Sequence, residues 1–600
     1  MSSQWPLQTD ASSSHTAEMV KITGLGIWTP LLTAPRWCVR ACYHIEPGAA
    51  YQPPATQHCF CTHPGAHLTD APIHPAFAAG RQPLVVETPA MSSLQKRAEA
   101  AASDAASVAV APPRLTHPEI RRVFYGLMLG GFLQAVNQTI VASALPTIGR
   151  DLNDFQNLSW VIIAFLLSAT IVAPLYGKLA DIHGRRGMML VALGLFVVGS
   201  ALCGMAQNMA MLIAGRTLQG IGGGGIVPMI QIIVADMVTP RERGRYQAYM
   251  GTAWIAAGTI GPALGGVIAE NWNWSMIFWL NVPLGLLAAA LLNRSIKRLP
   301  AVSHKHKLDF FGAALVMAAA TLLLLALTTG GTRVPWLSPT IVSLMVGSVL
   351  LTLVARWWLK RAPEPFLPLT VLANPIMKLG TAATSFAMGV MTGFMIYMPL
   401  YFQVVHHLTP TQAGLALIPV IVMTTPGSMA SGRAMMHLDR YKLSPYVGMS
   451  LATLAVATLV VWPDMPVLWA VAAIAMVGYG VGSVFPIATV CVQNAVWRHE
   501  VGIATGAMNF FRALTSALAV AIMGAILLSG LGFAPERGGG GVEVLAASAG
   551  ASGRDVAGVF QWVFVAALVF SVTSLIAIIL MEERPLDGAQ EVPPPTEPAE

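Results

Sequence analysis

Apolar windows of about 20 residues recur along this 600-residue chain from residue 122 to residue 581. A helix needs about that length to cross the hydrocarbon core of a bilayer, which is roughly 30 Å thick. Lipid offers the backbone no hydrogen-bond partners, and no segment alternates like a barrel strand, so helices are the expected spanning elements. The sequence therefore predicts an all-α integral membrane protein with fourteen spans. They are residues 122–145, 159–180, 187–206, 209–236, 246–269, 275–294, 309–329, 338–359, 377–402, 412–432, 443–462, 466–491, 504–529 and 560–581.

Charged residues are few, and their distribution indicates an orientation in the membrane. Hydrophobic residues make up 55% of the chain and charged residues 10%, a balance that a soluble protein could not bury. The formal charge of +7 does not indicate a nucleic-acid partner, because the basic residues lie in short loops. Most of these basic residues lie in the even-numbered loops. The odd-numbered loops contain only four basic residues, which are Arg150, Arg333, Arg537 and Arg554. By the positive-inside rule, the even-numbered loops and both termini are expected in the cytoplasm, on an inner (plasma) membrane.

Two segments of the chain repeat each other. The segment Gly220–Pro228 has the form GxGxGxxxP, and Gly478–Pro486 has the same form 258 residues later. The same offset pairs Asp236 with Asn494, Glu242 with Glu500, and Gly244 with Gly502. Spans 4–5 and 12–13 are therefore expected to be copies in one membrane orientation, as in transporters built from parallel repeats.

This repeat predicts two six-helix bundles, formed by spans 1–6 and 9–14, with spans 7 and 8 inserted between them. The expected domains are a disordered cytoplasmic extension at 1–115, a bundle at 116–300, two inserted helices at 301–365, a second bundle at 366–581 and a disordered cytoplasmic tail at 582–600. The extension is rich in Pro, Ala, Ser and His and has no sustained period. Met91 is an alternative start, which would place the preceding residues outside the working protein.

Four cysteines of the extension are compatible with two interpretations. Cys38, Cys42, Cys59 and Cys61 lie near histidines, and thiolate with imidazole suits zinc. Their spacings fit no zinc pattern, however, so unstructured polypeptide is the simpler interpretation and we expect no metal site.

The loop after span 2 reads GKLADIHGRR and contains Gly177, Asp181, Gly184, Arg185 and Arg186. Asp181 can cap a helix or pair with one of the arginines, which would hold neighbouring helix ends together in one conformation. An ordinary basic loop with an incidental carboxylate is the alternative interpretation.

Spans 4 and 5 contain two further unusual features. Arg216 lies inside span 4, where a charge costs at least about 2.5–3.5 kcal/mol, so it must face protein or water. It is either functional or a structural arginine tied to backbone carbonyls. Span 5 places small residues and a proline on essentially one face, where another helix can approach closely. These residues are Gly258, Gly261, Pro262, Gly265 and Gly266.

In combination, these motifs resemble the major facilitator superfamily, and within it the fourteen-span drug:proton antiporter branch of multidrug exporters. The resemblance covers about residues 120–581. It implies that the loop at Asp181 gates the conformational change, that Arg216 takes part in proton transfer, and that the stripe at Gly258 distinguishes exporters at the contact between halves. Ile182 stands where the family usually has arginine.

Span 1 departs from the branch in a way that affects coupling. Its segment VNQTIVASALP resembles LDxTIVNVALP, but Asn137 stands at the aspartate position and cannot carry a proton. With a proton as the expected coupling ion and no cofactor, the candidate carriers are Asp236 at the end of span 4 and Glu270 at the end of span 5, unless a histidine or the substrate carries it. We expect Arg216 and Asn137 to belong to the coupling site.

Polar residues inside the spans are expected in the central cavity, where each of them could equally bond helix to helix. They are Gln134, Gln138, Gln219, Asn509 and Arg512. With Met and aromatic side chains, they suit bulky neutral or anionic compounds better than dications.

The predicted function is secondary active export of small hydrophobic compounds by alternating access with proton antiport. A narrow-specificity metabolite uniporter or importer of the same fold is the alternative, and a membrane scaffold or embedded enzyme is a third. We expect no enzyme activity, because the chain has no HExxH, no GxSxG and no paired intramembrane carboxylates. Some members of this branch work with a periplasmic adaptor protein, so such a partner is also expected from the resemblance.

Overall fold

The computed structural model describes residues 117–154, 157–295, 309–331, 334–438, 440–497, 500–530 and 556–586, all within one compact unit, Ala100–Glu600. Apart from one isolated bridge between Gly330 and Val334, these described residues form helices, turns and loops without strands. Fourteen segments among them are long and apolar enough to cross a membrane. The predicted all-α fold with fourteen spans is confirmed. The extension 1–115 lies outside the described residues, so its disorder, its alternative start and its cysteines stay predictions.

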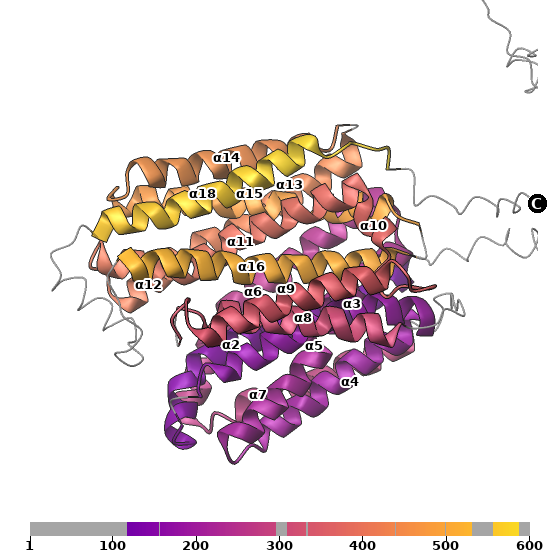
Figure 1. Ribbon diagram of the computed structural model, residues 1–600, viewed down its shortest axis with the longest axis horizontal. Helices are drawn as coiled ribbons and strands as arrows, with labels where there is room; N and C mark the ends of the chain where they lie inside the picture. Colours follow the sequence, from indigo (N-terminus) through magenta and orange to yellow (C-terminus); the bar gives the residue numbers. More distant parts are fainter. Residues whose placement is uncertain are drawn as a thin grey trace, which may run out of the picture. The chain divides into compact units, whose positions relative to one another are not determined.

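Six long helices make up the first half of the bundle. They are α2 (His117–Asp151), α3 (Trp160–His183), α4 (Arg185–Gly204), α5 (Met209–Met237), α6 (Pro240–Asn271) and α7 (Met276–Ser295). The second half contains α11 (Pro375–Val404), α12 (Pro410–Ala416), α13 (Ile418–His437), α14 (Leu443–Val461), α15 (Val467–Asn494), α16 (Val501–Gly530) and α18 (Val556–Leu580). Figure 1 shows these long helices running side by side. The expected tenth span is interrupted at Leu417, where α12 gives way to α13.

The two halves use the same helix pairings. In the first half α5 packs on α3 and α4, α6 packs on α2, and α7 packs on α4. In the second half α15 packs on α13 and α14, α16 packs on α11, and α18 packs on α14. The packing therefore repeats in the order that the sequence offset predicts. The exact domain boundaries stay a prediction, because residues 296–308 lie outside the described part.

The GxGxGxxxP segments explain why α5 and α15 occupy the centre of each half. A Cβ at Gly220 or Gly224 would clash with the backbone of α3, and a Cβ at Gly222 would clash with the backbone of α4. In α15, Gly478 and Gly482 meet α13 in the same way, while Gly480 meets α14. Each central helix therefore touches two neighbours at backbone distance, on two faces set by the glycine spacing.

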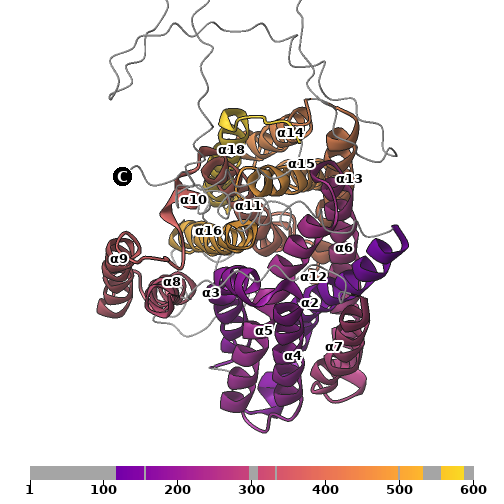
Figure 2. The ribbon, with the colours of Figure 1, turned by 90° about the vertical axis from the view of Figure 1, so that its right-hand side faces the viewer.

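The inserted helices form a hairpin beside the two halves. Helices α8 (Phe310–Thr329) and α9 (Pro339–Leu359) pack on each other, and α8 also contacts α3 and α16 (Figure 2). Asp309 caps α8 by accepting from the Gly312 amide at 2.8 Å. The same carboxylate accepts from Trp358 Nε1 at 3.0 Å and from the Phe366 amide at 3.2 Å. Asp309 thus joins both hairpin helices to the linker that precedes the short helix α10 (Leu369–Ala373).

We call the end of the bundle that holds the α3–α4, α5–α6 and α15–α16 junctions the even-loop end. The described part of the predicted C-terminal tail, residues 582–586, lies against this end. Tyr441 Oη donates to the Arg584 carbonyl at 2.7 Å, and Asn494 Nδ2 donates to the Pro585 carbonyl at 3.0 Å. Leu586 is buried. The first five residues of the segment predicted as a disordered tail therefore lie against the helices in the structure.

Replacing Gly222 by alanine should destabilise the first half, because the new Cβ would meet the Phe196 amide and the Ala192 carbonyl. Overpacking of this kind typically costs about 1–3 kcal/mol. Gly194→Ala on α4 is the matched control, since a Cβ there meets nothing within 4 Å. Thermal unfolding of the purified proteins in detergent should show a lower Tm for the first variant only, and equal Tm values would contradict the packing.

Candidate functional site

Two glycine crossings join the halves at the even-loop end. Gly177 of α3 lies against Gly502 of α16, and a Cβ at Gly177 would clash with the Gly502 carbonyl. Gly244 of α6 lies against Gly432 of α13, where a Cβ at Gly432 would lie 2.9 Å from the Gly244 carbonyl oxygen. Figure 2 shows α3 beside α16 and α6 beside α13. Because Gly244 and Gly502 are partners in the repeat, the two crossings are equivalent positions in the two halves.

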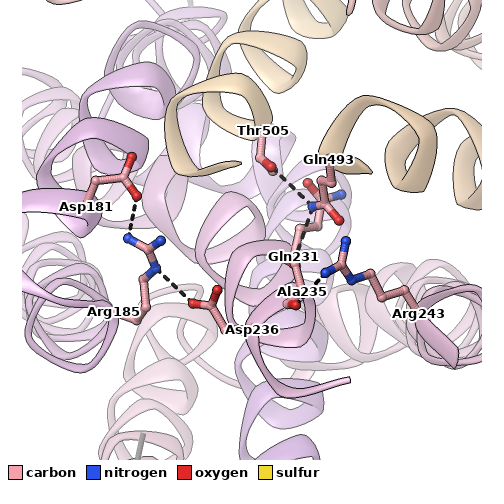
Figure 3. A network of polar contacts seen from close by, with 8 residues as sticks. All are labelled: Asp181, Arg185, Gln231, Ala235, Asp236, Arg243, Gln493 and Thr505. Atoms are coloured by element: carbon pink, nitrogen blue, oxygen red, sulfur yellow. Dashed lines mark hydrogen bonds and ion pairs between the residues drawn. The ribbon is translucent and has the colours of Figure 1, made fainter. Parts of the chain in front are cut away.

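An ion-pair network lies beside the first crossing. Arg185 donates from Nη1 to Asp181 Oδ1 at 2.5 Å and from Nε to Asp236 Oδ2 at 3.0 Å (Figure 3). The Asp181 and Arg185 side chains are 8% and 12% exposed, and that of Asp236 is 21% exposed. The network ties together the even-loop ends of α3, α4 and α5.

Asp181 also reaches the opposite half. A Cβ at Gly502 would lie 2.5 Å from Asp181 Oδ1, so the carboxylate sits at the first turn of α16. The N-terminal end of a helix carries partial positive charge, which favours an anion there. Asp181 is therefore not the cap of α4. Gly184 fills that position, with a φ of 85° that allows one residue to turn the chain between α3 and α4.

A second polar contact between the halves is built on Gln231 of α5. Its Oε1 accepts from Asn509 Nδ2 of α16 at 2.7 Å, and its carbonyl accepts from Gln493 Nε2 of α15 at 3.5 Å. Gln493 Nε2 also donates to Thr505 Oγ1 at 3.2 Å (Figure 3). Neither Gln493 nor Thr505 was predicted from the sequence as a functional residue. The position of Gln493 inside a span, one residue before the repeat partner of Asp236, is a sequence feature that could have identified it. In the structure Gln493 is buried.

Burial along α16 shows where the contact between the halves ends. Every residue from 501 to 510 is buried, whereas those from 511 to 518 are half-buried or exposed. The sealed segment 501–510 covers the glycine crossing and the Asn509 contact. Directly beyond Phe510, α16 is less buried over residues 511–518, and single buried residues recur from Ala519 onward.

Arg216 forms a separate, closed cluster inside the first half. Its Nε donates to the Val161 carbonyl at 2.8 Å, and its Nη1 donates to Gln219 Oε1 at 2.6 Å. The guanidinium carbon lies 4.3 Å from the centre of the Phe165 ring. The side chain is 2% exposed. All these partners are neutral, so dipoles and an aromatic face, rather than a carboxylate, stabilise this cation.

Asn137 lies at the centre of the same cluster. Its Oδ1 accepts from Gln219 Nε2 at 3.0 Å, from Asn281 Nδ2 at 3.2 Å and from Arg216 Nη1 at 3.4 Å. Its Nδ2 is buried and has no hydrogen-bond partner among the described residues. Three donors around one oxygen form a site that would suit a carboxylate better than an amide. Asn281 is buried in α7, and no spacing in the sequence predicts its contact with Asn137.

The structure separates several residues that the sequence grouped together. Asp236 and Arg216 lie on one helix about 30 Å apart, because the rise is 1.5 Å per residue, so Asp236 cannot be the ion-pair partner of Arg216. Glu270 lies in α6, but its side chain falls outside the described part. Gln138 is exposed, whereas Gln134 is buried and its Oε1 has no partner among the described residues.

The small-residue stripe of α6 does not face one partner. Gly261 and Gly265 pack on α2 of the same half, where a Cβ would clash with Thr139 and Ser143 respectively. Gly258 approaches α13 of the other half, with Ile421 Cγ2 at 3.9 Å from a built Cβ, and Gly266 has no neighbour within 4 Å. The side chain of Pro262 falls outside the described part. Most of the stripe therefore packs within the first half, and only Gly258 lies at the expected contact between halves.

A family model described as Major Facilitator Superfamily matches residues 127–520, from α2 into α16. The chain belongs to this superfamily. This confirms the resemblance that the motifs indicated. Membership of a family of transporters, together with fourteen candidate spans, makes the protein a multi-pass membrane transporter.

Curated relatives of this transporter include efflux proteins of fungi. "Efflux pump FUS6" of Gibberella fujikuroi is 34% identical over 427 residues, which are 67% of this chain and 74% of that protein. "Multidrug resistance protein fnx1" of Schizosaccharomyces pombe is 30% identical over 449 residues, 71% of this chain and 84% of that protein. The crystal structure of the human organic anion transporter MFSD10 matches with a TM-score of 0.52 at 16% identity, covering 78% of this chain and all of that one. This structural likeness shows the fold alone.

In this major facilitator protein, Arg185→Ala should remove most transport, because the buried Asp181 and the half-buried Asp236 would lose their shared cation. Removing one partner of a buried ion pair costs about 3–5 kcal/mol. Arg186→Ala is the matched control, since Arg186 is half-buried, contacts no carboxylate of the ion-pair network and donates to Asn293 of α7 within the same half. Transport per inserted protein in proteoliposomes checks both variants. Equal losses would contradict the role of the network at Arg185.

Asn137→Asp should raise the Tm, because the new carboxylate would accept from three donors and pair with Arg216. Hydrogen bonds to charged groups contribute about 1.5–3 kcal/mol, against the cost of burying the new charge. Gln138→Glu is the control for the added charge, since Gln138 is exposed on the same helix. Adding Arg216→Met to Asn137→Asp should abolish the gain. A Tm that falls in the single variant would show that the cluster does not favour an anion.

Proposed function

We propose that this transporter exports small hydrophobic compounds by alternating access, with protons moving inward in exchange. The observation that carries the proposal is the seal between the halves at the even-loop end. It consists of two glycine crossings, one carboxylate at a helix terminus and one amide pair. We propose that these contacts separate and re-form during the transport cycle. Export is preferred to uptake because two similar proteins are named an efflux pump and a multidrug resistance protein.

The structure corresponds to one state of the proposed cycle. The seal closes the even-loop end, and residues 511–518 of α16, directly beyond it, are half-buried or exposed. We further propose that the protein lies in the plasma membrane with both termini in the cytoplasm, as the loop charges predict. In that orientation, the described state would face outward and release substrate. The inward-facing state would require separation of Gly177 from Gly502 and of Gln231 from Asn509.

The ion-pair network offers a way to couple protons to this separation. Asp181 and Asp236 share Arg185, and protonation of either carboxylate would remove half of the negative charge that holds the guanidinium. Asp181 also holds the first turn of α16, so its neutralisation would weaken the seal directly. We therefore propose these two acids as the groups through which protons act, with Asp236 retained from the sequence analysis as a carrier.

Expression of the protein in an efflux-deficient host should lower susceptibility to at least some hydrophobic compounds, and an uncoupler should abolish the difference.

Asp236→Asn should reduce efflux about tenfold, since the amide cannot pair with Arg185 or release a proton. Asp151→Asn, at the exposed end of α2, is the matched control. Efflux of a preloaded fluorescent compound is measured for the wild-type protein, Asp236→Asn and Asp151→Asn.

The outcomes separate the parts of the proposal. No altered susceptibility to any compound, with confirmed membrane insertion, would contradict export of hydrophobic compounds. Efflux that persists with an uncoupler would contradict proton exchange while leaving export in place.

A further inference from the structure

Arg512 of α16 is a second arginine inside a candidate span, and it forms no ion pair with the described residues. It is about 16 Å along the helix from Val501, at a rise of 1.5 Å per residue, and thus near the middle of a core roughly 30 Å thick. Its Nη2 donates to Asn509 Oδ1, and its guanidinium carbon lies 5.5 Å from the centre of the Phe485 ring. No carboxylate of the described residues lies within ion-pair distance. A guanidinium has five N–H donors, so most of them are left without a side-chain acceptor there.

Arg512 differs from Arg216 in its surroundings. Arg216 is fully buried and its donors meet a backbone carbonyl and two amide oxygens. Arg512 is half-buried and occupies the first turn of α16 beyond the sealed segment 501–510. Its neighbour Asn509 donates to Gln231 of the first half. Arg512 therefore lies beside the contact between the halves, where the packing begins to loosen.

Near the middle of the described spans, positive charge also exceeds negative charge. Asp181 and Asp236 lie at the even-loop end, whereas Arg216 and Arg512 lie deeper in the bundle without a carboxylate partner among the described residues. A cation at the centre of a membrane protein is costly unless it is paired or reaches water. An anion that entered beside α16 would offset the charge of Arg512.

We propose that Arg512 binds the carboxylate of an amphiphilic organic anion, which narrows the substrate class of the proposed exporter to hydrophobic acids. The planar guanidinium can hold a carboxylate through two parallel hydrogen bonds, and it does so most strongly where water is scarce. Phe485 provides an apolar surface beside the head group. The bound anion would also engage the Arg512–Asn509–Gln231 chain, which links the site to the seal between the halves. This inference rests on the proposed export function.

Binding to the purified full-length protein tests the inference apart from transport. The probes are 1-pyrenebutyrate and its methyl ester, which share one hydrophobic body and differ in charge. We expect the wild-type protein to bind the acid about tenfold more tightly than the ester. Arg512→Gln should abolish this preference, and Arg512→Lys should retain part of it, because lysine keeps the charge but not the paired donors. Arg433→Gln, an exposed arginine of α13, is the matched control and should keep the full preference.

Fluorescence anisotropy measures the affinities, and a thermal unfolding curve for each variant shows that it is folded. Equal affinity of the wild-type protein for acid and ester, or a preference that survives in folded Arg512→Gln, would overturn the inference. Transport in proteoliposomes distinguishes this failure from a failure of the proposed function. Export of the ester but not the acid would refute the acid as the substrate class while leaving the proposed export function in place. Preferential binding of the acid without export of either compound would refute the proposed function while leaving the binding site at Arg512 in place.

Discussion

The two halves of this protein meet where glycine backbones touch. At Gly177–Gly502 and at Gly244–Gly432, helices of opposite halves approach more closely than any Cβ would allow. This contact places the other functional groups, because Asp181 can reach the first turn of α16 and Asn509 can reach Gln231 only when the helices are this close. Small residues allow helix backbones to approach this closely. The closure of the even-loop end therefore depends on these four glycines.

The two crossings are equivalent in backbone but not in chemistry. Beside Gly502 lies the Asp181 carboxylate with its partner Arg185, whereas beside Gly244 lies the thioether of Met435. The repeat partner of Asp236 is Asn494, which donates to the C-terminal segment at Pro585 instead of joining an ion pair. The charge network is thus confined to the first half. The second half uses its C-terminal segment to hold the corresponding helix ends together. This asymmetry places Asp181 and Asp236 beside the first crossing.

Some parts of the site could be predicted from the sequence, and the reasons are local. The loop GKLADIHGRR places an acid and a base four residues apart around a sharp turn, and they do pair. The repeat predicted that Gly244 and Gly502 are equivalent, and both lie at crossings. Other parts could not be predicted. The stripe from Gly258 to Gly266 looked like a single face, but the crossing angles of α6 divide it between α2 and α13. Sequence spacing alone does not specify these angles.

The residues around Arg216 likewise could be predicted only in part. The sequence indicated that Arg216 lacks the expected acid at position 137, and the structure places Asn137 Oδ1 among three donors. It could not show that Asn281 and Phe165 complete the cluster, because these residues come from two other helices. The sequence also could not show that Arg216 is fully buried whereas Arg512 is half-buried. That difference depends on where the seal between the halves ends.

The sequence by itself determined the number of spans, their helical state and the internal repeat, because these follow from the bilayer thickness and from backbone hydrogen bonding within each segment. Only the tertiary structure decided which glycines face a neighbouring backbone, which charges pair, and which end of the bundle is closed. These properties arise from contacts between helices that are far apart in the chain. A hydrophobicity pattern specifies that a helix is buried in a membrane, but it does not specify which helix lies beside it.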